Sequence, residues 1–152
     1  MKKMIALRSY LESLSFCHRI EKLDVWAEDL EQTTSGKYDG NSVLLYTMKY
    51  RAVFSVEGFV YSKDPIELLH TRLITWLADN DKRSDMEDAE LNISPEVLDK
   101  HTANIEITIM FEEDVYIVEN EAGQIEYAGR TWELADPEHD IAESFDLLSS
   151  NE

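Results

Sequence analysis

The chain has 152 residues, enough for one sizeable domain, and 43% of them are hydrophobic, so it can bury a core. Its formal net charge is −18, from 32 acidic and 14 basic residues. This charge disfavours specific binding to nucleic acid or to anionic membranes, and no run approaches the roughly 20 apolar residues of a membrane helix. The one cysteine, Cys17, excludes an internal disulfide and is typical of a reducing compartment. We therefore expect the protein in the cytoplasm of the cell that makes it.

The first third of the chain predicts a helix, a hairpin and one long strand. Apolar residues recur at helical spacing over 4–14, and residues 21–33 alternate as in a strand. Residues 33–42 contain two glycines and an Asp-Gly pair, which predicts a hairpin loop. From 44 to 56 every second residue is apolar, so we expect a strand with one buried face: Leu44, Tyr46, Met48, Tyr50, Ala52, Phe54 and Val56. A strand this long is expected to project beyond the body of the domain or to bend at a bulge.

A second helix is predicted over residues 65–79, with a well-marked start. Asp64 has the side chain of an N-cap, Pro65 suits the first helical position, and Glu67 completes a capping-box pattern. The apolar residues of this segment share one face, so the helix is expected to pack on a sheet. The polar residues that follow it, 80–87, are predicted to be a connection.

The second half of the chain predicts further strands. Residues 89–93 alternate until Ser94-Pro95 interrupts, and residues 103–111 alternate again. Two shorter strands, 115–119 and 124–127, bracket a predicted tight turn. The order of elements predicts an α+β fold: a mainly antiparallel sheet of four to six strands, with the N-terminal helix and the central helix packed on it.

We expect a single domain over residues 1–130, followed by an acidic tail over 131–152. No lysine or arginine follows Arg130. A short helix is predicted near 138–148, where three apolar residues share one face, or else this tail is disordered. These residues are Ile141, Phe145 and Leu148.

The sequence contains no metal-binding or cofactor motif, so we expect neither kind of ligand. The four histidines lack the spacing of metal ligands, and there is no glycine-rich phosphate loop. A segment starting at Asp79 resembles a calcium-binding loop in part. It has Arg83 where an oxygen ligand belongs and Ser84 in place of the required glycine.

Two groups of residues carry reactive side chains without a complete catalytic pattern. Glu112, Glu113 and Asp114 could serve a small hydrolase as acid and base, but in so acidic a chain such a cluster arises from composition alone, so we expect a solvated strand end. Cys17 is followed by His18, although sequence neighbours rarely have the geometry of a thiol and its base. We therefore predict that the protein is not an enzyme.

The distribution of charge along the chain is uneven. Residues 1–22 contain five basic and two acidic residues, so they carry +3 and the remaining residues carry −21. This polarity suits a head-to-tail contact between subunits, and it is equally compatible with a solvated basic helix that touches nothing.

The chain resembles the tail completion protein R family of contractile-tailed phages and their prophages over residues 7 to 130. The resemblance includes Trp76 near the end of the central helix and a Glu-x-x-Val pattern at Glu112 and Val115. The stretches that carry it are LRSYLESL (7–14), LLYTMKYRAVFSVEGF (44–59), DPIELLHTRLITWLADND (64–81) and AELNISPEVLDKHTANIEITIMFEEDVYIVENEAG (89–123).

The resemblance implies a structural role in the virion tail. Members are similar to tail terminators, which form rings, typically hexamers, on the finished tail tube and present a surface to the head connector. We therefore expect the tube protein, the head-connector proteins and further copies of the chain as partners. The candidate contact residues are Lys49, Arg51, Lys37, Tyr38 and Arg8. An alternative from the net charge is an acidic protein that mimics DNA and inhibits a nucleic-acid-binding enzyme.

Overall fold

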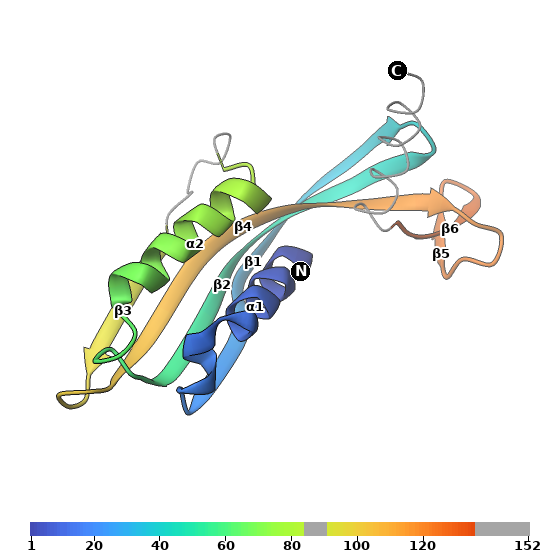
Figure 1. The fold of residues 1–152 in the computed structure, drawn as a ribbon. Helices are drawn as coiled ribbons and strands as arrows, with labels where there is room; N and C mark the ends of the chain where they lie inside the picture. Colours follow the sequence, from blue (N-terminus) through green and yellow to red (C-terminus); the bar gives the residue numbers. More distant parts are fainter. Residues whose placement is uncertain (84–90, 136–152) are drawn as a thin grey trace, which may run out of the picture. The chain divides into compact units, whose positions relative to one another are not determined.

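The computed structural model describes residues 1–83 and 91–135 (Figure 1). Its elements in chain order are α1 (Lys2–Ser13), the 3-10 helix η1 (Ser15–His18), β1 (Lys22–Asp39), β2 (Ser42–Phe59), α2 (Ile66–Asn80), β3 (Leu91–Val97), β4 (Ala103–Glu119), β5 (Ile125–Tyr127) and β6 (Arg130–Leu134). One sheet has the strand order β1-β2-β4-β6-β5, and β3 pairs with β4 beside this path. The predicted α+β class, with a mainly antiparallel sheet and two helices, is confirmed.

The chain forms two compact units, which share the three long strands. Unit 1 contains residues 1–30 and 49–112, and unit 2 contains residues 31–48 and the residues from Glu113 onward. β1, β2 and β4 each contribute one part to unit 1 and the other part to unit 2.

Unit 1 is a layer of strands covered by α1 and α2 (Figure 1). The alternation predicted for its part of β2 and for residues 103–111 is confirmed, because the predicted inward residues are buried. These residues are Tyr50, Ala52, Phe54, Val56, Ala103, Ile105, Ile107, Ile109 and Phe111. From the helices, Leu7, Leu11, Leu69, Leu73 and Leu77 are buried as well. Burial of each large side chain stabilises the fold by roughly 1.5–3 kcal/mol.

The start of α2 differs from the prediction by one residue. Pro65 is the N-cap, with extended backbone angles, and the helix begins at Ile66. The Asp64 carboxylate does not cap the helix, because the guanidinium of Arg19 holds both of its oxygens. Arg19 therefore lowers the pKa of Asp64 and links η1 to the segment that leads into α2.

β3 runs through the Ser94-Pro95 pair, so the predicted interruption is wrong. Pro95 lies opposite Ile105 within a continuous antiparallel register from Leu91 to Val97. Proline is tolerated here because β3 pairs only with β4, and an edge strand does not need every N–H for the ladder.

The predicted hairpin loop at 33–42 is also wrong, since most of it is strand. β1 extends to Asp39, and only Gly40 and Asn41 form the turn into β2. Gly40 has φ 63° while Asn41 does not have positive φ, the pattern of a type II′ turn with glycine at its first central position. β-Branched Thr33 and Thr34 suit the extended ladder better than a loop.

The acidic run does not separate two strands, because β4 continues from Ala103 to Glu119. The turn at 120–123 does not join paired strands either. Residues Ile117–Glu119 of β4 pair antiparallel with β6, a strand that the sequence did not predict. β5 pairs with β6 through a turn at Ala128 and Gly129, whose positive φ angles of 52° and 74° suit a type I′ turn.

The buried face of β2 changes along the strand. The prediction holds from Met48 to Val56, where the even-numbered residues are buried. From Val43 to Tyr46 it is wrong, because Val43 is fully buried while Leu44 and Tyr46 are only partly covered. Val43 packs with residues of β4 and β6, which form a separate small core.

Several predictions fall outside the described residues. These are Ala89 at the start of the predicted strand, the connection after Arg83, and the helix at 138–148. The division of the chain at residue 130 stays a prediction. Among the described residues, no helix is long and apolar enough to span a membrane.

Candidate functional site

The most exposed secondary structure is the part of β1 in unit 2. Every residue from Glu31 to Asp39 is exposed, and β1 ends the strand order, so its outer edge has no strand partner among the described residues. An edge strand of this kind presents unpaired backbone N–H and C=O groups. From Gln32 to Gly36 the strand has neither a charged residue nor a proline, the usual devices that block pairing. We call residues 31–39 the free edge.

The free edge belongs to a unit with its own core. Val43, Ile117 and Trp132 are buried together, and the partly buried Leu45, Ile125 and Tyr127 pack around them. The indole N–H of Trp132 donates to the carbonyl of Tyr127 at 2.7 Å, and Thr47 donates to Asp114 at 2.8 Å. The Tyr127 hydroxyl would lie 3.4 Å from a Cβ placed on Gly36, so β5 reaches the free edge closely.

β1 has an unusual backbone conformation at Asp29, near the end of its part in unit 1. Asp29 has φ 53°, the left-handed conformation that also occurs at β-bulges and that aspartate tolerates better than most residues. Its carboxylate pairs with Arg51 of β2.

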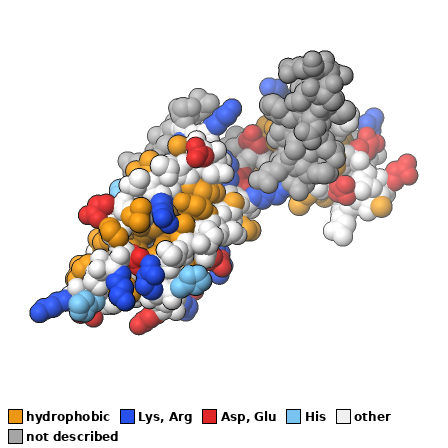
Figure 2. Space-filling model, in the orientation of Figure 1, with side chains coloured by type: hydrophobic (Ala, Val, Ile, Leu, Met, Phe, Trp, Pro, Cys, Tyr) orange, Lys and Arg blue, Asp and Glu red, His pale blue; other side chains and the backbone are white. Residues whose placement is uncertain are grey.

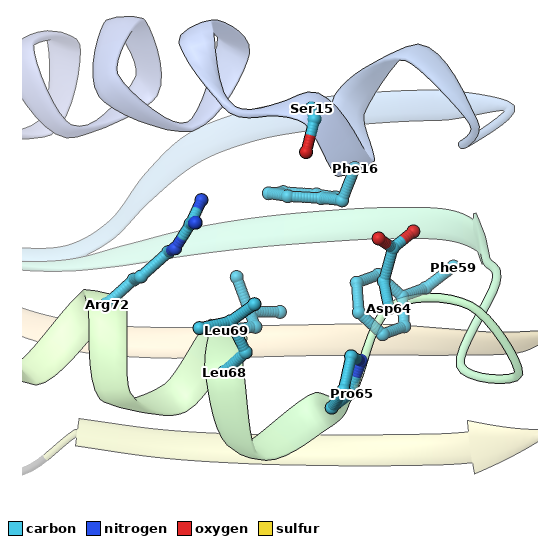
Figure 3. Close-up of a pocket in the computed structure, with 8 residues that line it drawn as sticks. All are labelled: Ser15, Phe16, Phe59, Asp64, Pro65, Leu68, Leu69 and Arg72. Atoms are coloured by element: carbon cyan, nitrogen blue, oxygen red, sulfur yellow. The ribbon is translucent and has the colours of Figure 1, made fainter.

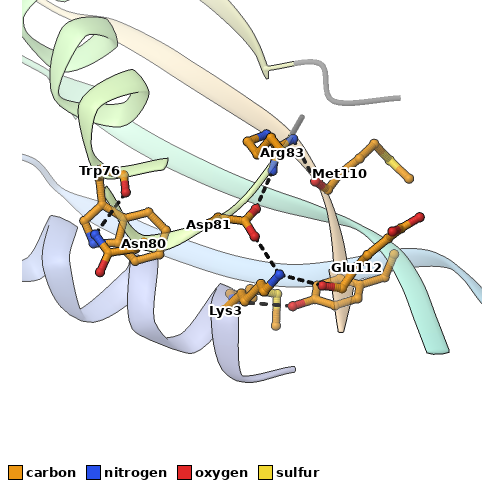
Figure 4. A network of polar contacts seen from close by, with 9 residues as sticks. Lys3, Trp76, Asn80, Asp81, Arg83, Met110 and Glu112 are labelled. Atoms are coloured by element: carbon orange, nitrogen blue, oxygen red, sulfur yellow. Dashed lines mark hydrogen bonds and ion pairs between the residues drawn. The ribbon is translucent and has the colours of Figure 1, made fainter. Parts of the chain in front are cut away.

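A buried ionic cluster joins three elements of unit 1 (Figure 4). The Asp81 side chain is 0% exposed and lies between Lys3 Nζ, at 2.5 Å, and Arg83 Nη1, at 2.8 Å. Lys3 also donates to the carbonyl of Glu112 at 2.7 Å, and Arg83 to that of Met110 at 2.9 Å. Because both cations also bond β4, the cluster fixes α1 and the end of α2 to that strand. Its closed set of partners indicates a structural role.

The residues with reactive side chains do not form a catalytic arrangement. Glu112, Glu113 and Asp114 lie on one continuous strand, so adjacent members point to opposite faces. Burial, followed by the nearby Glu12 carboxylate, raises the pKa of the Cys17 thiol, the opposite of what a nucleophile requires. Among residues 1–83 and 91–135, no group of three His, Cys, Asp or Glu side chains converges as metal ligands. Ser84 of the calcium-like segment lies outside these ranges.

A small hollow lies between η1 and the start of α2 in unit 1 (Figure 3). Phe16 and Phe59 form its apolar floor, with ring centroids 5.6 Å apart, and Leu68 and Arg72 line it from α2. Its volume is about 20 Å³, which is room for about one water molecule. It is therefore too small to enclose a cofactor.

The five predicted contact residues lie on three elements, β1, β2 and α1. Lys37 and Tyr38 lie on the free edge, where Tyr38 is 63% exposed. Lys49 and Arg51 lie on β2 within unit 1, and Arg51 is paired with Asp29. Arg8 lies on α1 and pairs with Glu12 at 3.0 Å. The role of all five residues as contacts stays a prediction.

Sequence reasoning missed two features for different reasons. β6 was detectable, because Trp132 and Leu134 alternate with polar residues after the Ala-Gly turn. The Lys3–Asp81 pair was not, because its members are 78 residues apart and neither has a local signature.

The comparisons with known proteins point to a phage tail. Residues 1–137 match the family described as P2 phage tail completion protein R (GpR). A relative in Haemophilus phage HP1 (strain HP1c1), described as an uncharacterized 19.2 kDa protein in the rep-hol intergenic region, is 23% identical over 125 residues. That match covers 81% of this chain and 75% of the relative. No solved structure matches the chain. The chain therefore belongs to the phage tail completion protein R family and has a phage tail-associated function.

Proposed function

We propose that this family member is a tail terminator. It binds the head-proximal end of the tail tube, stops growth of the tube and presents a surface to the head connector. Its partners are the tube protein, the head-connector proteins and further copies of itself, arranged as a ring for which a hexamer is the expected size. It acts by binding and not by catalysis, in the host cytoplasm during assembly and then in the virion tail. The family match over residues 1–137 supports the tail association on which this proposal rests.

The observation that carries the proposal is the free edge in unit 2. A strand of a neighbouring subunit or of the tube can extend the sheet there, because main-chain hydrogen bonds add affinity without requiring a particular side chain. Lys37 and Tyr38 are exposed on the same strand, where they would meet the added partner. A terminator needs such a surface, because it must bind the last ring of the tube polymer. It must then present no equivalent surface to which a further tube ring could bind.

The charge of the chain fits the passage of DNA through a ring. The net charge is −18, and the acidic residues far outnumber the basic ones. Carboxylates that face a lumen would repel the DNA phosphates and keep the DNA from adhering to the wall.

Deletion of the gene tests the proposed function. The deletion should give tails of irregular length that fail to join heads, and the intact gene supplied in trans should restore both properties. Electron microscopy of tails that contain a labelled protein should place the label at the head-proximal tip. Normal tails from the deletion would contradict termination, and absence of the label from the particle would favour the DNA-mimic alternative.

Proline substitutions on the free edge test its role separately. In an edge strand, one of two adjacent N–H groups faces the neighbouring strand and the next faces outward. One of the two substitutions Thr33→Pro and Thr34→Pro therefore removes an outward N–H donor and leaves the β1–β2 ladder intact. Hydrogen exchange of β2 identifies this variant, because the amides of β2 stay protected in it. That variant should fail to complement the deletion. Full complementation by it would show that the free edge is not the assembly surface.

A further inference from the structure

Two charged side chains on the free edge have no ionic partner within the described part of the chain. Glu31 and Lys37 are exposed, and neither forms an ion pair with another described residue. They lie six residues apart on one strand, so their side chains point to the same face of β1. Gly36 lies on the opposite face, where the hydroxyl of Tyr127 approaches it. Both charges are therefore open to a partner that pairs with the edge.

The free edge is complementary to a second copy of itself. Rotation about a two-fold axis normal to the sheet keeps each side chain on its own face, so a residue can lie opposite itself or opposite one an even number of positions away. With Thr34 opposite Thr34 of the second copy, each Glu31 lies opposite a Lys37. Each Thr33 then lies opposite a Ser35. Cross-strand pairs of opposite charge and pairs of hydroxyl side chains both stabilise antiparallel strands.

The neighbouring two-fold registers lack this match. If Ser35 lies opposite Ser35, each Glu31 faces an Asp39, and these two like-charged pairs are destabilising. If Gly36 lies opposite Gly36, no two charged residues of the free edge face each other. The charges therefore select the register that is centred on Thr34.

We propose that two copies of the protein form a dimer by antiparallel pairing of their free edges over residues 31–37, centred on Thr34. Main-chain hydrogen bonds join the two sheets, and the two Glu31–Lys37 pairs fix the register. The dimer covers the edge that tail assembly uses, so the free protein must dissociate before it binds a tail. This consequence for assembly rests on the proposed function, whereas the dimer itself does not.

The interface is small and polar, so the dimer is weak and reversible. On the face shown in Figure 2, hydrophobic side chains gather over the helices of unit 1, whereas residues 31–39 contain one large hydrophobic residue, Tyr38. The net charge of −18 on each copy also opposes association. At about 0.15 M salt this repulsion is screened beyond roughly 8 Å, while Glu31 and Lys37 in direct contact still attract.

Sedimentation equilibrium of the purified full chain at about 0.15 M salt tests the dimer. The wild type should shift from monomer to dimer as its concentration rises. Glu31→Lys and Lys37→Glu should each raise the dissociation constant by about tenfold, because two attractive pairs become repulsive. An equimolar mixture of these two variants should dimerise again, since every charge pair across the mixed interface is then opposite in sign. The matched controls Glu121→Lys and Lys100→Glu, at exposed positions outside the free edge, should leave the dissociation constant unchanged.

Three results of sedimentation would overturn the proposal. The first is a wild type that stays monomeric at about 1 mM. The second is a dimer that both charge reversals leave intact, and the third is a mixture of the two variants that does not recover. These measurements use the protein without tails, so their failure would leave the deletion test of tail termination unaffected.

Cross-linking tests the position of the two-fold axis. In a Cys17→Ser background, Thr34→Cys should give a dimer-sized product with a short bifunctional thiol reagent, because opposite Cβ atoms of an antiparallel pair lie about 4.5–5.5 Å apart. Asp39→Cys is the control on the same strand. Its two copies would lie about 34 Å apart, at about 3.4 Å per residue, so it should give no such product. Any other pattern of products would contradict the proposed pairing.

Discussion

Units 1 and 2 share three strands and differ in how those strands are covered. In unit 1, two helices bury one face of β2 and β4, and a charged cluster fixes the helices to the strands. In unit 2, three buried residues form the core and the whole of 31–39 is exposed. Stability is therefore concentrated in unit 1, whereas backbone available for pairing is concentrated in unit 2.

The first prediction compares two neighbouring positions on α2. Leu73 is fully buried and Ile74 is 52% exposed. Leu73→Ala should lower the free energy of unfolding by about 2–5 kcal/mol, because it leaves a cavity in the core of unit 1. Ile74→Ala should change it by less than about 0.5 kcal/mol. Urea denaturation followed by circular dichroism measures both, and equal losses would contradict the assigned burial.

The second prediction concerns the ionic cluster of unit 1. Asp81→Asn removes the negative charge from two cations that lie against β4, so the free energy of unfolding should fall by about 2–4 kcal/mol. Asp79→Asn, an exposed position two residues earlier, is the matched control and should have little effect. A neutral outcome for Asp81→Asn would mean that the cluster does not hold α1 to the strands.

The third prediction concerns the small core of unit 2. Trp132→Ala should lower the local stability of unit 2 by about 2–3 kcal/mol, because it leaves a cavity in this small core. Hydrogen exchange should accelerate in residues 113–119 and remain unchanged in 50–56. Equal acceleration in both segments would show that the two units unfold as one.

The fourth prediction concerns pH. The hydrogen bond from the Arg19 guanidinium lowers the pKa of Asp64, and burial only partly opposes this shift. The pair therefore stabilises the fold above the unfolded-state pKa of about 4. This contribution is lost as the pH falls through the lower pKa of the folded state. The pair is partly exposed, so Asp64→Asn should cost less than about 1 kcal/mol at pH 7 and nothing well below pH 4. Thermal unfolding between pH 2 and pH 7 measures the difference, and a loss that is constant over this range would contradict the assignment.

Strong local patterns in the sequence predicted most of unit 1. The alternation in β2 and in 103–111, and the apolar face of α2, identified the residues that are buried, because one core covers one face of each element. The prediction from composition was wrong at 33–42. The glycines there indicated a loop, but pairing with β2 keeps the chain extended to Asp39. The interruption predicted from Pro95 was also wrong, because a proline interrupts a central strand but is tolerated in an edge strand such as β3.

Unit 2 was harder to predict because its contacts are not local. The change of buried face on β2 depends on Ile117 and Trp132, which lie far from Val43 in the sequence. The acidic run suggested a strand end, but its polar residues are accommodated within β4 at partly exposed positions. Of the candidate site, the sequence predicted Lys37 and Tyr38 as contact residues. It did not predict the exposed backbone of the same strand, because only the strand order shows that β1 lies at the edge of the sheet.

The most direct test of the central claim is a density map of capped tails by cryo-electron microscopy. The account predicts a ring of this protein at the head-proximal tip, with residues 31–39 paired to a strand of the neighbouring subunit or of the tube. A ring in which residues 31–39 face solvent and the helices of unit 1 make the contacts would contradict it.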